Sequence, residues 1–323
     1  MVALTPMVAH AKGAKDKALS AQTLQQGIYL ALFIGITAML VLLYFTTPLM
    51  QIMGVTADIQ VMTQDYLSYI AYGLPAVAVH QALRSYNEAI NLTQPVTVIA
   101  IIGLLLNVPL NMVFVLGFGP IEALGGPGCG LASCIIFYLL VIALALFTLL
   151  SKHHQKVKPL ANFSKPNRQV MLKILRIGLP IGLAIFVEVS LFCVIALLIA
   201  RLGPQVVAAH QITLNISSLL FMVPLSLALA LTVRVGQELG KGNANIAKAT
   251  WRGGLKINLV FSLINALILL LFSQQVVGFY TQDSDVSTLA ASLLFYVAIF
   301  QISDGIQVGA AGALRGYNDT LVT

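Results

Sequence analysis

The stretch GLPIGLAIFVEVSLFCVIALLIA, residues 178–200, decides the fold class of this chain. About 20 consecutive apolar residues are enough for a helix to cross the hydrocarbon core of a bilayer. The one charged residue in the stretch, Glu188, lies 12 residues after Arg176 and 13 residues before Arg201. Because a charge near the bilayer centre costs roughly 2.5 to 3.5 kcal/mol on insertion scales, we expect Glu188 to have a function.

Apolar stretches of similar length recur along the chain. Besides residues 177–200, they cover residues 24–45, 66–83, 96–116, 131–150, 212–233, 255–272 and 289–313. They lack the alternation of apolar and polar positions that is typical of transmembrane barrels, so helices are expected. The sequence therefore predicts an all-α polytopic membrane protein with eight complete transmembrane helices visible.

The composition excludes an ordinary soluble domain and argues against a nucleic-acid partner. Apolar residues make up 59% of the 323 residues and charged residues 9%, with a mean hydropathy of +0.92. A soluble domain would be about 25% charged. The net charge is +7, but the basic residues alternate with the spans and form no single patch. If the spans alternate in direction, 17 of the 18 Lys and Arg residues fall on one side, which the positive-inside rule makes cytoplasmic.

Two parts of the sequence repeat each other. The residues from Ala3 read ALTPMVAHAKG and those from Ala230 read ALTVRVGQELG, an offset of 227 that also aligns Gly27 with Gly254. A later pair, LRSYNE from Leu83 and LRGYND from residue 314, has an offset of 231. The second copy is therefore about one helical turn longer, and the chain is built from two related halves.

The repeat predicts a larger architecture of two lobes. Some helices of each half have no counterpart in the other half. Adding those counterparts gives twelve helices, six per half, and because six is even, the two halves have the same orientation across the membrane. Residues 1–150 are then an N-terminal lobe without its first helix and most of its second. Residues 177–323 are a C-terminal lobe without its last two helices, and residues 151–176 are a cytoplasmic linker. We interpret His153 and His154 as part of a solvated linker rather than a metal or lipid site.

A second carboxylate, Asp304, lies within the last apolar stretch, 11 residues before Arg315. If Arg176 and Arg315 mark the same membrane face, a helical rise of about 1.5 Å per residue places both acids roughly 16 to 18 Å above it. We therefore expect Glu188 and Asp304 to share a cavity and to take up a cation, since no Lys or Arg lies in the interior of a span to pair with either, and Lys256 is at the edge of its span. The alternative is a protonated carboxyl group that only hydrogen-bonds between helices.

Amide and hydroxyl side chains at helical spacing are candidates for the wall of a polar cavity. Gln301 and Gln307 recur with Asp304 every three residues and so share a helix face. The candidates of this kind are Asn107, Asn111, Gln211, Asn215, Ser218, Gln301 and Gln307. The alternative for the amides is hydrogen bonding between helices, which contributes about 0.6 kcal/mol on average in membranes.

Motifs for nucleotide binding and catalysis are not found in the sequence. Residues 236–241 read GQELGK and lack the spacing and the final Ser or Thr of a phosphate-binding loop. The loops contain no set of nucleophile, base and orienting residue. We therefore expect neither ATP use nor an enzyme, and no cofactor other than a coupling ion.

Four longer stretches carry a family resemblance: GLPIGLAIFVEVSLF from Gly178, AAHQI from Ala208, SLALALTVRVGQELGKG from Ser226 and FQISDGIQVGAAGALRGYND from Phe300. With them the chain resembles the multidrug and toxic compound extrusion (MATE) family, in its bacterial NorM-type branch. The similarity runs along the whole chain, which corresponds to the end of the family's second helix through its tenth.

The resemblance implies a V-shaped, two-lobed secondary transporter that exchanges Na+ or H+ for organic cations and other drugs across the bacterial inner membrane. It implies that Glu188 and Asp304 bind the coupling cation, as metal ligands if the cation is Na+. It also implies that Asn107 and Asn111 line the cavity of the first lobe. Some relatives have Tyr where this chain has Phe300, which adds that position to the candidate site. The implied partners are small-molecule drugs and membrane lipid, and we expect a monomer.

Two alternatives belong to other functions. A flippase for lipid-linked sugars would have a similar architecture, but it would carry basic residues in a central cavity, and the interiors of the eight predicted spans contain no Lys or Arg. A non-transporting membrane fragment would have no use for the two buried acids.

Overall fold

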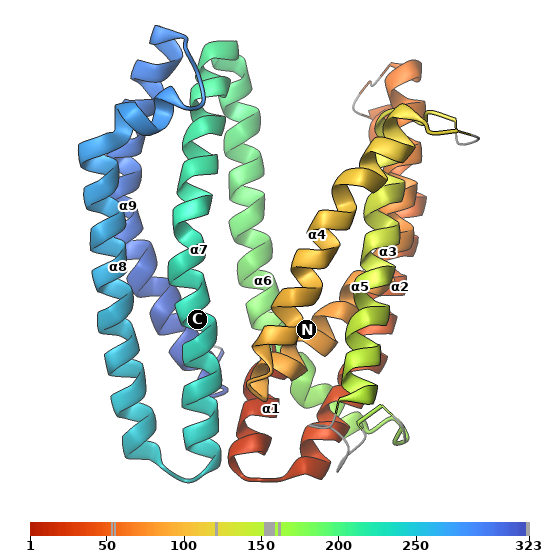
Figure 1. The fold of residues 1–323 in the computed structure, drawn as a ribbon, viewed down its shortest axis with the longest axis vertical. Helices are drawn as coiled ribbons and strands as arrows, with labels where there is room; N and C mark the ends of the chain where they lie inside the picture. Colours follow the sequence, from red (N-terminus) through yellow and green to blue (C-terminus); the bar gives the residue numbers. More distant parts are fainter. Residues whose placement is uncertain (53, 55, 120–121, 152–158, 161–162, 321–323) are drawn as a thin grey trace. The chain divides into compact units, whose positions relative to one another are not determined.

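The structure is a computed structural model, and it describes residues 1–323 except 53, 55, 120–121, 152–158, 161–162 and 321–323. The described residues are helical, without a β-strand (Figure 1). The helices are α1 (Leu4–Gly13), α2 (Lys17–Ile52), α3 (Ala57–Ala89), α4 (Thr93–Leu116), α5 (Gly126–Leu150), α6 (Arg168–Ile199), the short 3₁₀ helix η1 (Ala200–Leu202), α7 (Pro204–Gly240), α8 (Ala244–Gly278) and α9 (Ser284–Gly316).

Seven of the described helices are long and apolar enough to cross a membrane, namely α2 and α4 to α9. The predicted span at residues 66–83 lies in α3, which has 33 residues but is not among the seven. His80 and Gln81, together with three tyrosines, make this stretch more polar than the others. The prediction of eight spans is thus confirmed for seven helices, and the span in α3 stays a prediction.

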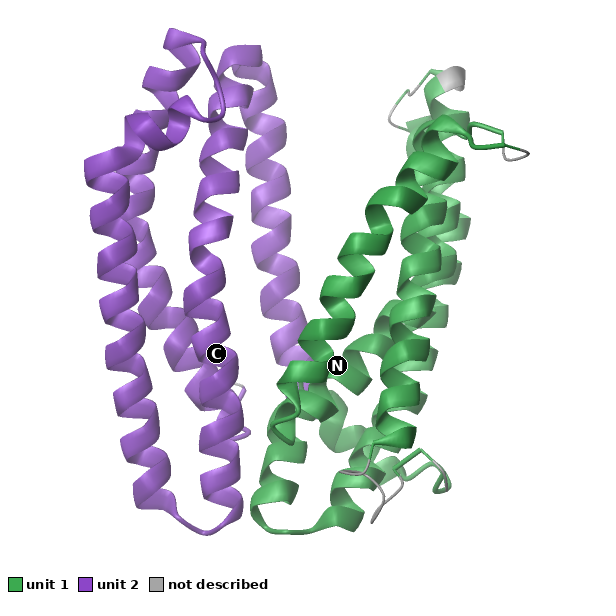
Figure 2. Ribbon diagram, viewed as in Figure 1, with its two compact units in different colours: residues 1–175 green, residues 176–323 purple. Residues whose placement is uncertain are grey.

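The chain divides into two compact units, residues 1–175 and residues 176–323 (Figure 2). Unit 1 contains α1 to α5, and unit 2 contains α7 to α9. The boundary between Leu175 and Arg176 falls inside the continuous helix α6. One helix therefore begins in the first unit and ends in the second.

In unit 1 the central helix is α3, which packs against α2 and α5. Glycines let the helices approach closely. A Cβ atom added to Gly35 of α2 would lie 2.6 Å from Pro75 Cα of α3, and one added to Gly73 of α3 would lie 2.9 Å from the Phe137 ring of α5. Small residues of this kind are typical of helix contacts in membranes, where close packing replaces the hydrophobic driving force.

Unit 2 is held together by mutual packing of α7, α8 and α9. Its buried apolar core consists of Ala209, Ile216, Ala266, Leu269, Val277, Val286, Ala290, Leu294 and Ala298. At one end of α9 a Cβ atom added to Gly312 would overlap the backbone of Ala228 in α7, and Thr232 Oγ1 donates a hydrogen bond of 2.7 Å to Gly312 O. In the most apolar 18-residue stretch of α6, in contrast, no residue is buried inside the protein.

The internal repeat is visible in the helix boundaries. Helices α2 and α8 begin at Lys17 and Ala244, and α3 and α9 span Ala57–Ala89 and Ser284–Gly316. Each pair of boundaries differs by 227 residues, the offset found in the sequence. The paired helices therefore begin at corresponding places, with 36 and 35 residues in α2 and α8 and 33 residues in both α3 and α9, so the turn expected from the second offset does not make α9 longer than α3.

One contact also repeats at the level of side chains. A Cβ atom added to Gly27 of α2 would lie 2.6 Å from the δ carbons of Leu4 in α1. In the second half, a Cβ atom added to Gly254 would overlap the δ carbons of Leu231. Both residues of this contact are separated from their counterparts by 227 positions, so the repeat preserves packing as well as helix length.

We predict that Gly312→Ala lowers the stability of the protein. The added methyl group would meet the Ala228 backbone, which has no flexible end that could move aside, and overpacking of this kind costs about 1 to 3 kcal/mol. The matched control is Gly182→Ala in α6, where no atom lies within 4 Å of the added Cβ. Thermal unfolding of the purified protein in detergent should show a lower midpoint for Gly312→Ala alone. Equal midpoints for both variants would contradict the packing described for α7 and α9.

Candidate functional site

Glu188 lies in the apolar part of α6 and is exposed in the structure. Pro180 lies two turns earlier in the same helix. A proline has no backbone N–H, so the carbonyl of Arg176, four residues before it, has no helical donor. The helix is therefore weakened on the approach to Glu188.

Asp304 lies in α9 and is half-buried. The charge of Glu188 acts on Asp304, so these two carboxylates of unit 2 are electrostatic neighbours. The charge of Glu188 also acts on Arg315, whose Nε has no hydrogen-bond partner among the described residues. The structure thus places a basic side chain near Glu188, although Arg315 lies outside the predicted span.

The three polar residues predicted to form a stripe on α9 differ in their exposure to solvent. Gln301 is 2% exposed, Asp304 is half-buried, and Gln307 is exposed. Phe300, at the position where some MATE relatives have Tyr, is exposed. A cavity wall made of Gln301 and Gln307 together stays a prediction, because Gln301 faces the packed interior of unit 2.

The remaining amide candidates occupy α4 and α7. In α4, Asn111 Nδ2 donates to the backbone oxygen and to Oδ1 of Asn107, each at 2.9 Å. In α7, Gln211 and Ser218 are exposed, and Asn215 Oδ1 accepts a 2.8 Å hydrogen bond from Tyr280 Oη. The residues of α4 belong to unit 1 and those of α7 to unit 2, and their part in substrate binding stays a prediction.

A further polar stripe in α8 was not predicted from the sequence. Asn258, Ser262 and Asn265 recur at i, i+4 and i+7 and are all buried. Asn265 Nδ2 donates a 3.2 Å hydrogen bond to Leu220 O, the carbonyl that Pro224 leaves without a helical donor. The spacing of the three polar residues within an apolar stretch would have revealed the stripe.

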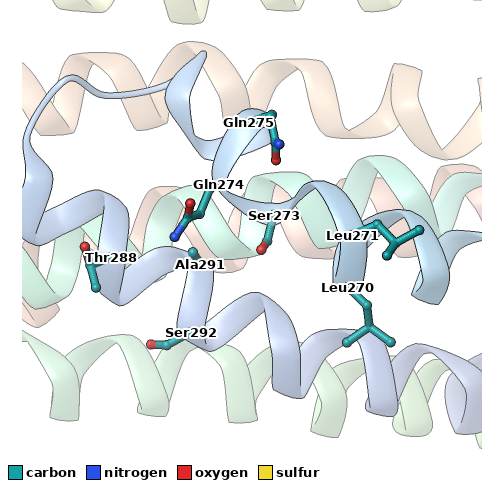
Figure 3. Close-up of a pocket in the computed structure, with 8 residues that line it drawn as sticks. All are labelled: Leu270, Leu271, Ser273, Gln274, Gln275, Thr288, Ala291 and Ser292. Atoms are coloured by element: carbon teal, nitrogen blue, oxygen red, sulfur yellow. The ribbon is translucent and has the colours of Figure 1, made fainter.

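A pocket of about 430 Å³ lies between the end of α8 and the start of α9 (Figure 3). It is lined by Leu270, Leu271, Ser273, Gln274, Gln275, Thr288, Ala291 and Ser292. The backbone of Phe272 departs from helical geometry here, with φ −122° and ψ 16°, which bends α8 beside the pocket. Ser292 lies 12 residues before Asp304, so the pocket is about 18 Å along α9 from the acid.

The connection that leads from α5 to α6 is fastened to α2. Gln25 Oε1 accepts hydrogen bonds from the backbone and hydroxyl of Ser164 at 2.9 and 2.8 Å, and Gln25 Nε2 donates to Pro159 O at 2.8 Å. Gln26 Oε1 accepts from Asn167 N at 2.8 Å. Both glutamines are buried. The described part of the predicted linker is therefore ordered against unit 1, whereas residues 152–158, including His153 and His154, lie outside the described residues.

Among the described residues, no group of three or more His, Cys, Asp or Glu side chains could hold a metal ion. The pair Glu188 and Asp304 supplies two carboxylates, and further ligands would have to come from uncharged oxygens. Such a set suits a proton or an alkali cation better than a transition metal.

Comparison with known proteins places the chain in a family. Residues 1–113 and 180–323 match the family model MatE. The chain belongs to the MatE family. Among relatives of this MatE protein, the multidrug resistance protein NorM of Aliivibrio fischeri is 41% identical over 319 residues, covering 99% of this chain and 69% of the relative. The multidrug resistance protein NorM of Vibrio cholerae is 40% identical over 320 residues, covering 99% and 70%.

Solved structures share the fold of this MatE chain. The crystal structure of the eukaryotic MATE transporter AtDTX14 matches with a TM-score of 0.85 at 23% identity, over 99% of this chain and 70% of that one. A crystal structure of MATE in the straight conformation matches with a TM-score of 0.87 at 20% identity, over the same shares. The resemblance in sequence to the MATE family is thus confirmed.

We predict that Gln26→Leu loosens the connection to α6. The substitution removes the acceptor of Asn167 N and the donor to Lys165 O, and leaving partly buried backbone groups unpaired costs about 1 to 3 kcal/mol. Trypsin should then cut faster after Arg168, which follows directly. Gln22→Leu, one turn earlier in α2, is the matched control and should cleave at the wild-type rate. Equal cleavage of both variants would show that Gln26 does not hold the connection.

Proposed function

We propose that this protein is a secondary active multidrug efflux transporter that exchanges Na+ or H+ for organic cations and other drugs across the bacterial inner membrane. The observation that carries the proposal is the presence of two carboxylates, Glu188 and Asp304, inside two long apolar helices of a MatE chain, near enough for the charge of one to act on the other. The curated relatives at about 40% identity bear the name multidrug resistance protein. Seven described helices that are long and apolar enough to span a membrane support a multi-pass membrane protein.

The two carboxylates are proposed to couple ion movement to drug movement. A cation bound between Glu188 and Asp304 removes the negative charge that would hold a cationic drug. When the ion leaves on the other side of the membrane, the charge returns and the next drug can bind. Because the two acids interact, the occupancy of one changes the affinity of the other, so they act as one site.

The amide residues are proposed to contact the drug. Asn107 and Asn111 offer an amide cluster on α4, and Gln211 and Ser218 offer exposed polar groups on α7. Amides can donate and accept hydrogen bonds without fixing a net charge. Such groups suit a transporter of varied substrates, whereas a dedicated receptor for one anion would carry fixed basic groups.

We predict that Glu188→Gln and Asp304→Asn each lower gradient-driven efflux by roughly tenfold or more. An amide keeps the shape of the carboxyl group but cannot take up and release the charge of a cation. The assay is uptake of a fluorescent organic cation into everted vesicles under an imposed Na+ or H+ gradient. Testing each gradient separately also identifies the coupling ion.

The matched control is Asp285→Asn, at the exposed start of the same helix α9. It removes one carboxylate from unit 2 without touching the apolar middle of the helix, and it should transport at the wild-type rate. Immunoblots of the vesicles keep the comparison at equal protein. Wild-type efflux in both acid variants would remove Glu188 and Asp304 from the mechanism.

A further inference from the structure

Helices α8 and α9, which lie side by side in Figure 1, bury three oxygen atoms that have no hydrogen-bond partner in the described part of the chain. Asn258 and Ser262 meet Gly309 and Gly305 at the seam where the two helices pack, and Gln301 lies one turn before Gly305 in α9. They are Asn258 Oδ1, Ser262 Oγ and Gln301 Oε1. Asn258 and Ser262 are 0% exposed. Because buried polar groups are nearly always paired and an unpaired one costs free energy, three such atoms on two packed helices indicate a ligand.

The orientation of the Asn258 amide is determined by its nitrogen. Nδ2 donates a 2.7 Å hydrogen bond to Gly305 O. A carbonyl oxygen cannot donate, so reversing the amide would place two acceptors against each other. The atom of Asn258 that is left for a ligand is therefore Oδ1, an oxygen like the other two.

Two glycines of α9 make room for these side chains. A Cβ atom added to Gly305 would overlap Ser262 Oγ, and one added to Gly309 would lie 2.8 Å from Asn258 Nδ2. Any larger residue at these positions would push the polar side chains out of the seam. The helices are thus shaped to admit them.

The first half of the chain packs the same two helices without polar groups. At the repeat offset of 227, the counterparts of Asn258 and Ser262 are Ala31 and Gly35, and Gln301 matches Leu74 at this offset or Ile70 at the later offset of 231, both apolar. The contact between the two helices is kept, since a Cβ atom added to Gly35 would lie 2.6 Å from Pro75 Cα of α3. Packing of this helix pair therefore does not require the three polar residues.

The surrounding charge indicates which ligand the oxygens hold. Asp304 lies three residues after Gln301, and the charge of Glu188 acts on it. The carboxylate of Asp304, one turn from Gln301, attracts a cation more strongly than a neutral water molecule, and Arg315, on which the charge of Glu188 also acts, lies eleven residues further along α9. Uncharged amide and hydroxyl oxygens are hard ligands that suit an alkali ion, and a divalent ion would require carboxylates among its ligands.

We propose that Asn258, Ser262 and Gln301 form a sodium site in the seam of α8 and α9, separate from the two coupling carboxylates. This goes beyond the proposed function, because it assigns a ligand to residues of α8 that the exchange at Glu188 and Asp304 does not use. A bound Na+ satisfies the three oxygens and so stabilises the packing of unit 2. The folded protein should therefore be more stable in sodium than in choline.

The test uses the purified full chain in detergent, with NaCl exchanged for choline chloride at constant ionic strength. Thermal unfolding and equilibrium binding of ²²Na+ are both measured. Wild type should bind Na+ and unfold at a higher midpoint as Na+ rises. The variant Asn258→Ala, Ser262→Gly, Gln301→Leu places apolar first-half residues at these positions, and it should bind one Na+ fewer than wild type and lose the stabilisation by Na+ that the seam site provides. The same three changes at exposed positions, Asn245→Ala, Ser292→Gly and Gln282→Leu, should keep that ion and that stabilisation.

A single substitution keeps the test decisive if the triple variant does not fold. Ser262→Ala removes one oxygen from a position where the first half has glycine, and it should weaken ²²Na+ binding by about tenfold or more. The double variant Glu188→Gln, Asp304→Asn should still bind Na+ and still be stabilised by it.

Three results would overturn the sodium site. One is wild type that neither binds Na+ nor gains stability from it, which would leave water as the ligand of the seam. The second is full Na+ binding in Ser262→Ala or in the folded triple variant. The third is loss of Na+ binding in the double acid variant, which would assign the sodium to the carboxylates. The three results are read from two measurements, Na+ binding and thermal stability, so they are independent of whether efflux depends on the acids.

Discussion

The structure depends on one constraint, which is that the hydrocarbon core of a bilayer offers no water to backbone N–H and C=O groups. Every interruption of a helix therefore needs a partner inside the protein. Pro224 interrupts α7, and the carbonyl that it leaves open, Leu220 O, accepts a hydrogen bond from Asn265 of α8. The buried Asn265 amide of α8 thus supplies the hydrogen bond that the backbone of α7 lacks at Leu220. The same rule makes unpaired polar atoms in the spans informative, because few have any other reason to be there.

Much of the fold could be predicted from the sequence, because bilayer thickness sets the length of each span. Glu188 and Asp304 could be found for a related reason, since a lone acid in an apolar stretch is costly and visible. The repeat was readable from short matched segments, and the helix boundaries follow the same offset. The span in α3 was less certain, because His80 and Gln81 dilute an apolar stretch that is long enough to cross.

The finer arrangement of the polar residues could not be read from helical spacing. Gln301 and Gln307 share a face with Asp304 by periodicity, yet Gln301 is buried and Gln307 is exposed. Which part of a helix face is covered depends on where the neighbouring helix crosses it, and a single helix does not contain that information. The docking of Gln25 and Gln26 on the connection to α6 was equally hidden, because their partners lie more than 130 residues away.

The position of the unit boundary inside α6 has a mechanical consequence. Unit 1 holds the start of this helix through the bond from Asn167 N to Gln26, and unit 2 holds it from Ile177, whose carbonyl accepts a 3.1 Å hydrogen bond from Thr320. Residues 168–176 lie between these two hydrogen bonds and form a short helical segment that is attached at both ends. Its far end contains the carbonyl that Pro180 leaves without a helical donor, so bending costs least there. Within α6 the carbonyl of Arg176 is therefore the place where the helix bends most easily, three turns before Glu188.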